Sequence, residues 1–363
     1  MPFNLNLEKA SPTAITVALE PTRSVLAGMV MLTKDEDLPG ISSWLLDHRR
    51  ALTKKQKFQH TLVVIGFYHV IAPEDGSLSF PEHIKSLAQT DPQVLLKRML
   101  DAYAHMGAEH GKSKNVDWKS VLASAKNYTD FLRERFGPEA VIEDIEVKAF
   151  EYVKDPPAMK TLIVNHLQKM WDDVFKAEWE RVEPMLKESV KAFQSTDFSK
   201  MDRFEATRFV TGQDLDEEKW RPALERASRI IFIPNAHIGP YVSRLPDEKD
   251  LIILFGARQP ENATVRVPEL DRADVVSRLA ALADDTRLQI LQMIRDRGEM
   301  RAQEIMEATQ LSQPSVSRYL GQLTATGFLQ ERRISGAKAY VLNRERIAKT
   351  LKSISVTLLG QDQ

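Results

Sequence analysis

The sequence predicts a mainly α-helical protein with small β elements, divided into a large helical N-terminal domain and a smaller C-terminal domain. The length of 363 residues is more than one small domain needs. Apolar residues recur at helical spacing over most of residues 20–194, and short apolar runs bounded by turn residues follow between 229 and 256. After residue 271 the pattern changes to short helices followed by two strands.

The composition is that of a globular protein without thiol chemistry. Apolar residues make up 43% of the chain and charged residues 28%, as in ordinary globular proteins. The chain contains no cysteine, which excludes disulfides, thiolate metal ligands and thiol redox sensing. The longest apolar run, residues 61–71, is too short to span a bilayer, and the N-terminus shows no secretion signal. We therefore expect a cytoplasmic protein that does not associate with a membrane.

Residues 1–260 are predicted to form one mostly helical domain. A short strand is expected at 14–19, and the predicted helices are 25–32, 41–52, 53–67, 81–88, 92–106, 116–136 and 140–153. The longest periodic run follows Asp155-Pro156-Pro157 and places Trp171, Phe175 and Trp179 on one stripe. Such a stripe is compatible with a ligand pocket, but the spine of a helical core is the more common arrangement.

The helical period ends before residue 229. Residues 229–234 and 250–256 are apolar runs between turn residues, which predicts buried strands and a short β-hairpin near 229–256. Residues 258–268 include two prolines and no helical period, so we expect a linker there.

Residues 271–363 are predicted to form a second, tightly organised domain. The expected elements are helices at 275–283, 286–297, 302–309 and 312–323, strands at 328–334 and 337–342, and a last helix after Asn343. Two helices joined by a tight turn and followed by a twisted hairpin make a winged helix-turn-helix domain, whose second helix enters the DNA major groove.

The functional prediction depends on residues 311–323. Val316, Leu320 and Leu323 predict one buried helix face, with Ser312 as its N-cap. The opposite face carries short hydrogen-bonding side chains and one guanidinium, with no acidic residue. Its members are Gln313, Ser315, Ser317, Arg318 and Gln322. A face that serves only solubility normally carries Glu and Lys, so we predict that this one binds double-stranded DNA.

Individual contacts follow from the chemistry of these side chains. Arg318 can bind O6 and N7 of a guanine, and Gln313 can bind N6 and N7 of an adenine. Ser315 and Ser317 suit phosphate or base contacts, and the DNA-binding assignment also includes Ser312 and Gln322.

Basic residues on the predicted hairpin extend this surface. Arg332, Arg333 and Lys338 are expected to hold the adjacent DNA backbone, which gives an affinity that falls with salt. The alternative is a solvated strand face. Residues 271–363 contain 14 Lys and Arg against 11 Asp and Glu, a net charge of +3 within a chain whose net charge is −1. This small excess is weak support for nucleic-acid binding.

The last predicted helix carries a second apolar pattern. Ile347, Leu351, Ile354 and Leu358 alternate by four and three residues. This spacing is typical of a helix that packs against a partner helix, and we therefore assign these residues to dimerisation.

Three stretches of this domain resemble the ArsR family of bacterial transcriptional repressors. Residues 282–291, Leu-Ala-Asp-Asp-Thr-Arg-Leu-Gln-Ile-Leu, are similar to the family's opening signature. Residues 311–320 resemble its recognition helix, and Gly327-Phe328-Leu329 with the basic residues that follow resembles its wing. The resemblance implies a homodimer, with the first and last helices of the domain packed across a two-fold axis, that binds an imperfect palindrome.

The chain departs from this family in three ways. Metal-sensing members carry a Cys-x-Cys pair, but the matching positions here are Arg301 and Gln303, and no histidine follows His237. We therefore predict no metal site. Gln310 stands where a glycine is usual. The large N-terminal region resembles an extended subset of these regulators and implies no known chemistry.

The predicted function is a homodimeric repressor whose N-terminal domain senses a non-metal small molecule or stabilises the dimer. We find no phosphate-binding loop, nucleophile elbow or paired-histidine zinc motif in the sequence, so no catalytic residue, cofactor or enzymatic activity is predicted. His105 and His110 are spaced unfavourably for a metal site. Two alternatives remain: an N-terminal enzyme with the winged helix as an accessory, and a winged helix that binds protein.

Overall fold

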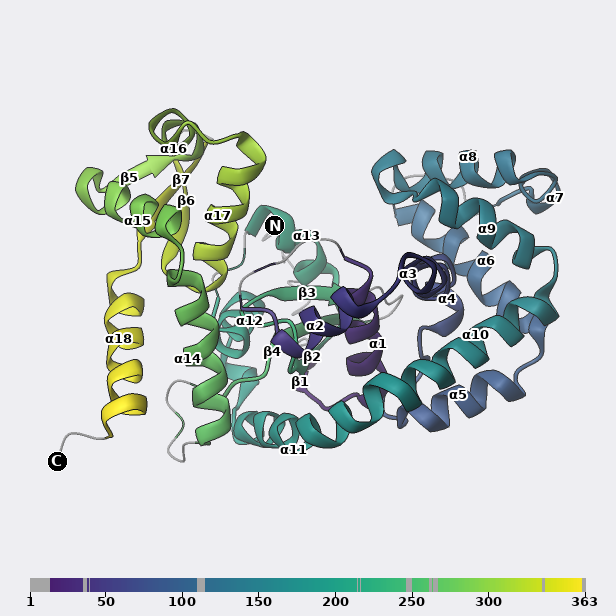
Figure 1. The fold of residues 1–363 in the computed structure, drawn as a ribbon, viewed down its shortest axis with the longest axis horizontal. Helices are drawn as coiled ribbons and strands as arrows, with labels where there is room; N and C mark the ends of the chain where they lie inside the picture. The colour runs from purple at the N-terminus through teal and green to yellow at the C-terminus, as the bar shows by residue number, and fades with distance from the viewer. Residues whose placement is uncertain are drawn as a thin grey trace, which may run out of the picture. The chain divides into compact units, whose positions relative to one another are not determined.

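The computed structural model describes residues 14–34, 38, 40–109, 115–213, 215, 217–245, 250–260, 263, 267–334 and 337–360 (Figure 1). Most of these residues are helical and the strands are short, which confirms the predicted fold class. The chain forms two compact units. Unit 1 contains residues 1–19, 37–42 and 183–363, and unit 2 contains residues 20–36 and 43–182. The division into domains at 1–260 and 271–363 stays a prediction.

Unit 2 is helical throughout its described residues. Its elements are α1 (Pro21–Leu32), α2 (Ser43–Ala51), α3 (Lys54–Thr61), η1 (Leu62–Gly66), α4 (Tyr68–Ile71), α5 (Phe80–Gln89), α6 (Pro92–Glu109), α7 (Trp118–Val121), α8 (Ala125–Phe136), η2 (Pro138–Ala140), α9 (Glu143–Val153), α10 (Pro156–Met170) and η3 (Trp171–Phe175). The next helix, α11 (Lys176–Phe193), begins in unit 2 and ends in unit 1. Thr53 and Gln56 form a capping box at α3. Among the helices described, none has the length and apolar character needed to cross a membrane.

The aromatic stripe of η3 packs into the core of unit 2. Trp171 and Phe175 are buried, and the ring centroid of Phe175 lies 5.4 Å from that of Trp44. A Cβ atom added to Gly28 of α1 would lie 2.8 Å from the Phe175 ring, so α1 and this ring touch directly. These contacts favour the interpretation of the stripe as the spine of a helical core.

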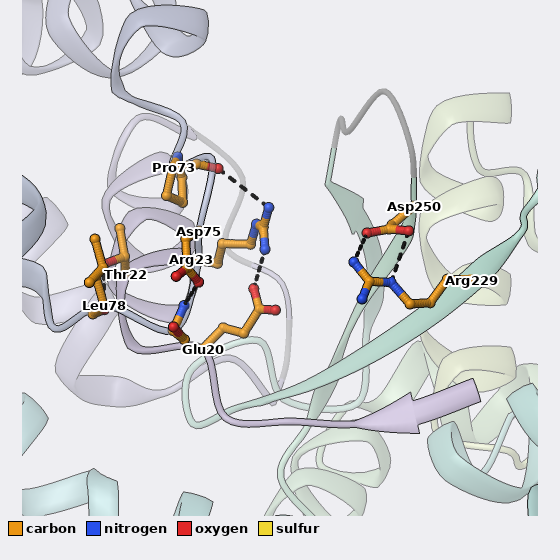
Figure 2. Close-up of polar contacts among 9 residues, drawn as sticks. Glu20, Thr22, Arg23, Pro73, Asp75, Leu78, Arg229 and Asp250 are labelled. Atoms are coloured by element: carbon orange, nitrogen blue, oxygen red, sulfur yellow. Dashed lines mark hydrogen bonds and ion pairs between the residues drawn. The ribbon is translucent and has the colours of Figure 1, made fainter. Parts of the chain in front are cut away.

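A buried ion pair fixes the start of α1 (Figure 2). Glu20 and Arg23 are both largely buried and bind each other. The Nη2 atom of Arg23 also donates to the carbonyl of Pro73 at 3.3 Å, and Oγ1 of Thr22 donates to the carbonyl of Leu78 at 2.8 Å. The loop between α4 and α5 is therefore attached to α1 by two side chains, those of Thr22 and Arg23. Removal of either charge of the ion pair would leave the other buried without its partner.

Unit 2 also buries a carboxyl group for which the described residues provide no ion-pair partner. Glu146 of α9 is buried, and its Oε2 atom has no hydrogen-bond partner there. Tyr128 of α8 is buried nearby. Burial raises the pKa values of Tyr103 on α6 and of Tyr128, and the nearby charge of Glu146 raises both pKa values further. Burial raises the pKa of Glu146 to about 7.

Unit 1 contains a four-stranded sheet in the order β1-β2-β4-β3. Its strands are β1 (Ala14–Val17), β2 (Arg229–Asn235), β3 (Val242–Leu245) and β4 (Leu251–Gly256). Nε of Arg229 donates to Oδ1 of Asp250 at 3.0 Å, which holds the starts of β2 and β4 together (Figure 2). Phe193, Val210, Leu224, Phe232 and Phe255 belong to its core, to which α12 (Arg203–Thr211) and α13 (Glu217–Arg226) contribute. A short 3₁₀ helix, η4 (Phe198–Lys200), precedes α12.

The stretch near 229–256 contains a β-hairpin, but it does not join the two strands that the sequence identifies. β2 pairs with β4 in parallel, and β1 joins β2 in parallel, whereas the hairpin in this stretch is made by β3 and β4. β2 and β4 are continuous apolar runs that are buried along nearly their whole length. Such runs are typical of central strands in a parallel sheet, because both faces are covered.

The C-terminal part of unit 1 is a winged helix-turn-helix, as predicted. Its elements are α14 (Pro268–Leu282), α15 (Asp285–Arg297), β5 (Glu299–Arg301), α16 (Ala302–Thr309), α17 (Gln313–Ala325), β6 (Leu329–Ile334), β7 (Ala337–Leu342) and α18 (Arg344–Leu359). The strands form an antiparallel sheet in the order β5-β7-β6. Asp284 caps α15 and Asn343 caps α18. α14 begins earlier than predicted because Pro268 suits the first helical position.

The turn between α16 and α17 carries a strained residue. Gln310 ends α16 in the left-handed region, with φ of 56°. Glycine adopts this conformation without steric penalty, whereas a residue with a Cβ atom does not. The position at which Gln310 departs from the family pattern is therefore one at which the backbone favours glycine.

Candidate nucleic-acid interface

α17 has one buried and one exposed face, as its sequence predicts. Val316, Leu320 and Leu323 are almost completely buried in the domain core. Ser312 precedes the helix with an extended backbone, its Oγ atom lies 3.0 Å from that of Ser315, and Pro314 occupies the first turn. The buried face fixes the rotation of α17, so the N-terminal half of its opposite face points away from the domain.

Four of the predicted contact residues lie on this exposed half. Ser312, Gln313, Ser317 and Arg318 are exposed, and Ser315 is half-buried. No acidic residue occurs in α17, and among the described residues no carboxylate forms an ion pair with Arg318. The guanidinium of Arg318 lies 5.3 Å from the ring centroid of Tyr319. The N-terminus of a helix carries a partial positive charge, so this surface suits a polyanion.

The prediction that Gln322 belongs to this face is wrong. Gln322 is only 3% exposed, and its Oε1 atom accepts a hydrogen bond from Nη1 of Arg287 at 2.6 Å. Gln322 shares the face of Arg318 by spacing, but the corner between α14 and α15 covers that face at the C-terminal half of α17. Arg287 belongs to the signature at residues 282–291, and its buried guanidinium needs a hydrogen-bond acceptor. Gln322 provides that acceptor.

Arg287 holds three helices together. Its Nη2 atom donates to the carbonyl of Ala280 in α14 at 3.0 Å, while Nη1 binds Gln322 in α17. We expect Arg287→Lys to lower the free energy of unfolding by about 1–3 kcal/mol, because one ammonium cannot replace both planar donors and leaves a buried acceptor unpaired. Urea denaturation of the full chain measures this change. Arg295→Lys, at an exposed position of α15, is the control, and equal stability of the two variants would contradict the expectation.

The wing brings two of its three predicted residues to one face. Arg333 and Lys338 are directly opposite each other in the β6–β7 pair, whereas Arg332 is opposite Ala339 and so points to the other face. Lys338 forms an ion pair with Glu331 at 2.7 Å, and Arg332 and Arg333 are exposed. The like charges of Arg333 and Lys338 repel each other across the two strands. A DNA phosphate bound between them would reduce this repulsion. Residues 335–336 lie outside the described residues.

The predicted dimerisation helix exposes apolar side chains. Leu351 is 57% exposed and Leu358 is 75% exposed, whereas Ile354 is half-buried and Ile347 packs partly against the domain core. α14 also exposes two apolar side chains, since Val276 is 56% exposed and Leu279 is 40% exposed. α14 and α18 pack against each other and are joined by a hydrogen bond from Nη1 of Arg278 to Thr350 at 3.0 Å.

Arg301 and Gln303, the two positions compared above with a Cys-x-Cys pair, contact carboxylates on α16. Arg301 ends β5 and donates its backbone N–H to Glu304 at 2.6 Å, and the side chain of Gln303 donates to Glu307 at 3.2 Å. Within the described ranges, no three His, Asp or Glu side chains are grouped so that they could hold a metal ion. His110 of the predicted histidine pair lies outside those ranges.

Similarity to known proteins falls on this domain. Residues 284–331 match the family described as bacterial regulatory protein, arsR family. The arsenic resistance transcriptional regulator ArsR1 of Pseudomonas putida is 46% identical over 52 residues, which are 14% of this chain and 41% of that regulator. A second arsenic resistance transcriptional regulator of Pseudomonas putida, ArsR2, is 36% identical over 83 residues, which are 23% of this chain and 72% of that regulator.

A third relative comes from another organism. A probable mercury resistance operon repressor of Streptomyces lividans is 39% identical over 87 residues, or 24% of this chain and 68% of the repressor. The chain thus spans less than half the length of the first of these relatives and about two thirds or more of the other two. All three similarities cover less than a quarter of this chain.

Proposed function

The chain belongs to the ArsR family of bacterial regulatory proteins, and from that premise we propose that it is a homodimeric repressor of transcription that binds a palindromic operator. The observation that carries the proposal is the exposed half of α17, which has four accessible polar side chains and no acidic residue. The same exposure disfavours the alternative of a protein-binding module, which requires Gln313, Ser317 and Arg318 to be buried against another domain.

On DNA, α17 would lie in the major groove with its N-terminal half toward the bases. Arg318 is then the guanine-binding residue and Gln313 the adenine-binding residue, while Ser312, Ser315 and Ser317 bind phosphate or base atoms. The wing residues Arg332, Arg333 and Lys338 would bind the backbone beside the groove, and their charges make affinity fall as salt rises. The cytoplasm is the compartment in which such a regulator acts.

The dimer interface would be the apolar surface shared by α14 and α18. Leu351, Ile354 and Leu358 supply it from α18, and Val276 and Leu279 supply it from α14. Burial of this surface against a second copy removes exposed apolar area from water at about 25 cal/mol per Å², and a two-fold interface repeats α17 for the second half-site.

Selection of the full chain against random double-stranded DNA tests the function. We expect an enriched imperfect palindrome whose half-sites are about 34 Å apart, one helical turn, or a multiple of that distance. The absence of any enriched sequence would exclude a sequence-specific regulator.

Charge at the apolar surface is expected to dissociate the dimer. Leu351→Glu combined with Leu358→Glu buries two unpaired carboxylates in each copy, which opposes association because a buried charge without a partner is strongly unfavourable. Sedimentation velocity should then show a monomer, and binding to the palindrome should weaken more than binding to a half-site. Lys352→Glu, on the neighbouring exposed face of α18, is the control, and a double variant that still sediments as a dimer would place the interface elsewhere.

The N-terminal part of the chain, residues 1–260, would regulate the winged helix, residues 271–363. We assign it either the binding of a non-metal small molecule or stabilisation of the dimer. The control of DNA binding then originates before residue 271.

A further inference from the structure

Three backbone segments of unit 1 meet at the carboxyl ends of β2 and β4. The amide of Ser42 donates to the carbonyl of His237 at 3.1 Å. A Cβ atom on Gly239 would clash with the carbonyl of Gly40, and a Cβ atom on Gly256 would clash with the carbonyl of Gly239. Residues 40–42, which precede α2, the β2–β3 loop and the end of β4 are therefore packed backbone to backbone. We call this arrangement the glycine junction, formed by Gly40, Gly239 and Gly256.

The glycine junction also touches α14. A Cβ atom at Gly40 would lie 3.1 Å from Oγ of Ser277 and 2.9 Å from Cδ of Pro240. Ser277 is 9% exposed, and its hydroxyl finds no hydrogen-bond partner in the described part of the chain. At Ser277 itself the contact with Gly40 and Pro240 is therefore one of packing, without a hydrogen bond from the hydroxyl.

α14 is attached to other parts of the chain near both ends. In its first turn Asp271 accepts a hydrogen bond from Nε2 of Gln259 at 2.9 Å, which ties the helix to the segment after β4. Toward its last turn the carbonyl of Ala280 accepts from Arg287, which also binds Gln322 of the recognition helix. A displacement of α14 at Ser277 therefore reaches α17 through Arg287.

We propose that α14 is the element through which the N-terminal part of the chain controls DNA binding, and that the packing of Gly40 and Pro240 against Ser277 is the point at which it acts. This inference rests on the proposed function. Residues 40–42 lie between α1 and α2, and both helices belong to unit 2. A change at the start of α2, which begins at Ser43, is passed along residues 40–42 to Gly40 and then, by contact, to α14.

The same helix would set the geometry of the dimer. Val276, beside Ser277 in sequence, is exposed on the surface assigned to the partner copy. A shift of α14 therefore changes both the orientation of α17 within one copy and the distance between the two α17 helices. DNA half-sites have a fixed spacing, so either change lowers affinity without any alteration of a DNA-contacting side chain.

The first test enlarges the side chain at the contact. Ser277→Leu should separate Gly40 from α14, weaken binding to the selected palindrome on the order of tenfold and speed amide hydrogen exchange in α17 of the DNA-free protein. Ser277→Ala keeps the contact and removes an unpaired hydroxyl, so it should match the wild type in both measurements. Arg272→Leu adds the same side chain at an exposed position of α14 and controls for the leucine itself.

The second test locks the same contact and does not depend on Ser277→Leu folding. The chain has no cysteine of its own, so Gly40→Cys with Ser277→Cys forms the only available disulfide within a copy. The distance of 3.1 Å between a Cβ at position 40 and Oγ of Ser277 suits such a bond. The substitution strains position 40, because Gly40 has a φ of 83° and its Cβ would lie 2.9 Å from Cδ of Pro240. Oxidation should slow amide exchange in α14 and α17 and change DNA affinity, dithiothreitol should restore both, and the reduced protein controls for the strain at position 40.

The outcomes separate this inference from the proposed function. If the wild type selects no DNA sequence, the proposed function fails, yet exchange in α17 still reports whether Ser277 and α17 are coupled. If the wild type binds DNA but neither Ser277→Leu nor the disulfide alters exchange in α17 or DNA affinity, α14 does not transmit control and the inference is overturned.

Discussion

Replacement of Arg318 by alanine is expected to weaken binding to the selected palindrome by roughly 10- to 100-fold, or about 1–3 kcal/mol. Arg318 is exposed on α17, and its planar guanidinium can donate two hydrogen bonds to one guanine. The loss should be confined to sites that carry this guanine, so that the variant tolerates other bases at that position. Fluorescence anisotropy on the palindrome and on each single-base variant measures both effects.

Two further substitutions separate base recognition from charge. Arg318→Lys keeps the positive charge but loses the bidentate geometry, and should therefore relax specificity almost as much as alanine does. Arg333→Ala, on the wing face that also carries Lys338, should weaken binding to all sequences alike and reduce the salt dependence by about one phosphate contact. If Arg318→Ala weakened specific and random DNA equally, Arg318 would be a backbone contact and the orientation assigned to α17 would be wrong.

Stability of unit 2 is expected to fall by roughly 3 kcal/mol as pH rises from about 4.5 to about 7, through Glu146 alone. Burial raises the pKa of Glu146 from 4.5 to about 7 in the folded protein. Over this window the folded state holds a proton that the unfolded state has released, so each rise in pH favours unfolding. The contribution is fully present below the unfolded pKa and is lost as pH passes the folded one.

Glu146→Gln should remove this dependence, because the amide has the size of the neutral carboxyl and cannot ionise. Burial lowers the pKa of His69 to about 4 and that of His166 to about 3, and these groups act in the opposite direction, since the unfolded state binds the proton more tightly. The difference between wild type and Glu146→Gln across pH therefore isolates Glu146. Asp144→Asn, at an exposed carboxyl of α9, is the control, and parallel stability curves for wild type and Glu146→Gln would refute the assignment.

The winged helix could be predicted from sequence because its determinants are local. Asp284 and Asn343 cap helices that begin at the next residue, and the spacing of Val316, Leu320 and Leu323 alone defines the buried face of α17. The helical spacing places Gln322 on the DNA-binding face, but Gln322 is buried because it binds Arg287, which lies on another helix. Helical spacing shows which residues share a face, but it does not show where a neighbouring helix covers that face.

The parallel sheet could not be predicted for a related reason. The apolar runs of β2 and β4 identify both as buried strands, but their adjacency in sequence favours a hairpin, and the third parallel strand, β1, comes from the start of the chain. Likewise, nothing in the local sequence around Gly40 or Ser277 indicated that they meet. The features that could not be predicted, namely the burial of Gln322, the parallel sheet and the contact of Gly40 with Ser277, all depend on segments that are distant in sequence.

The position of β1 at the edge of that sheet has a consequence for synthesis of the protein. The partner of Ala14 is Arg229, so at typical translation rates β1 leaves the ribosome roughly 10–40 s before the strand that it joins. During that time β1 has no strand to pair with, and every helix of unit 2 emerges first. A chain shortened to begin after Val17 would leave an edge of β2 uncovered, with an apolar strand available for pairing with other chains. Such a truncated protein is expected to aggregate even though its winged helix is intact.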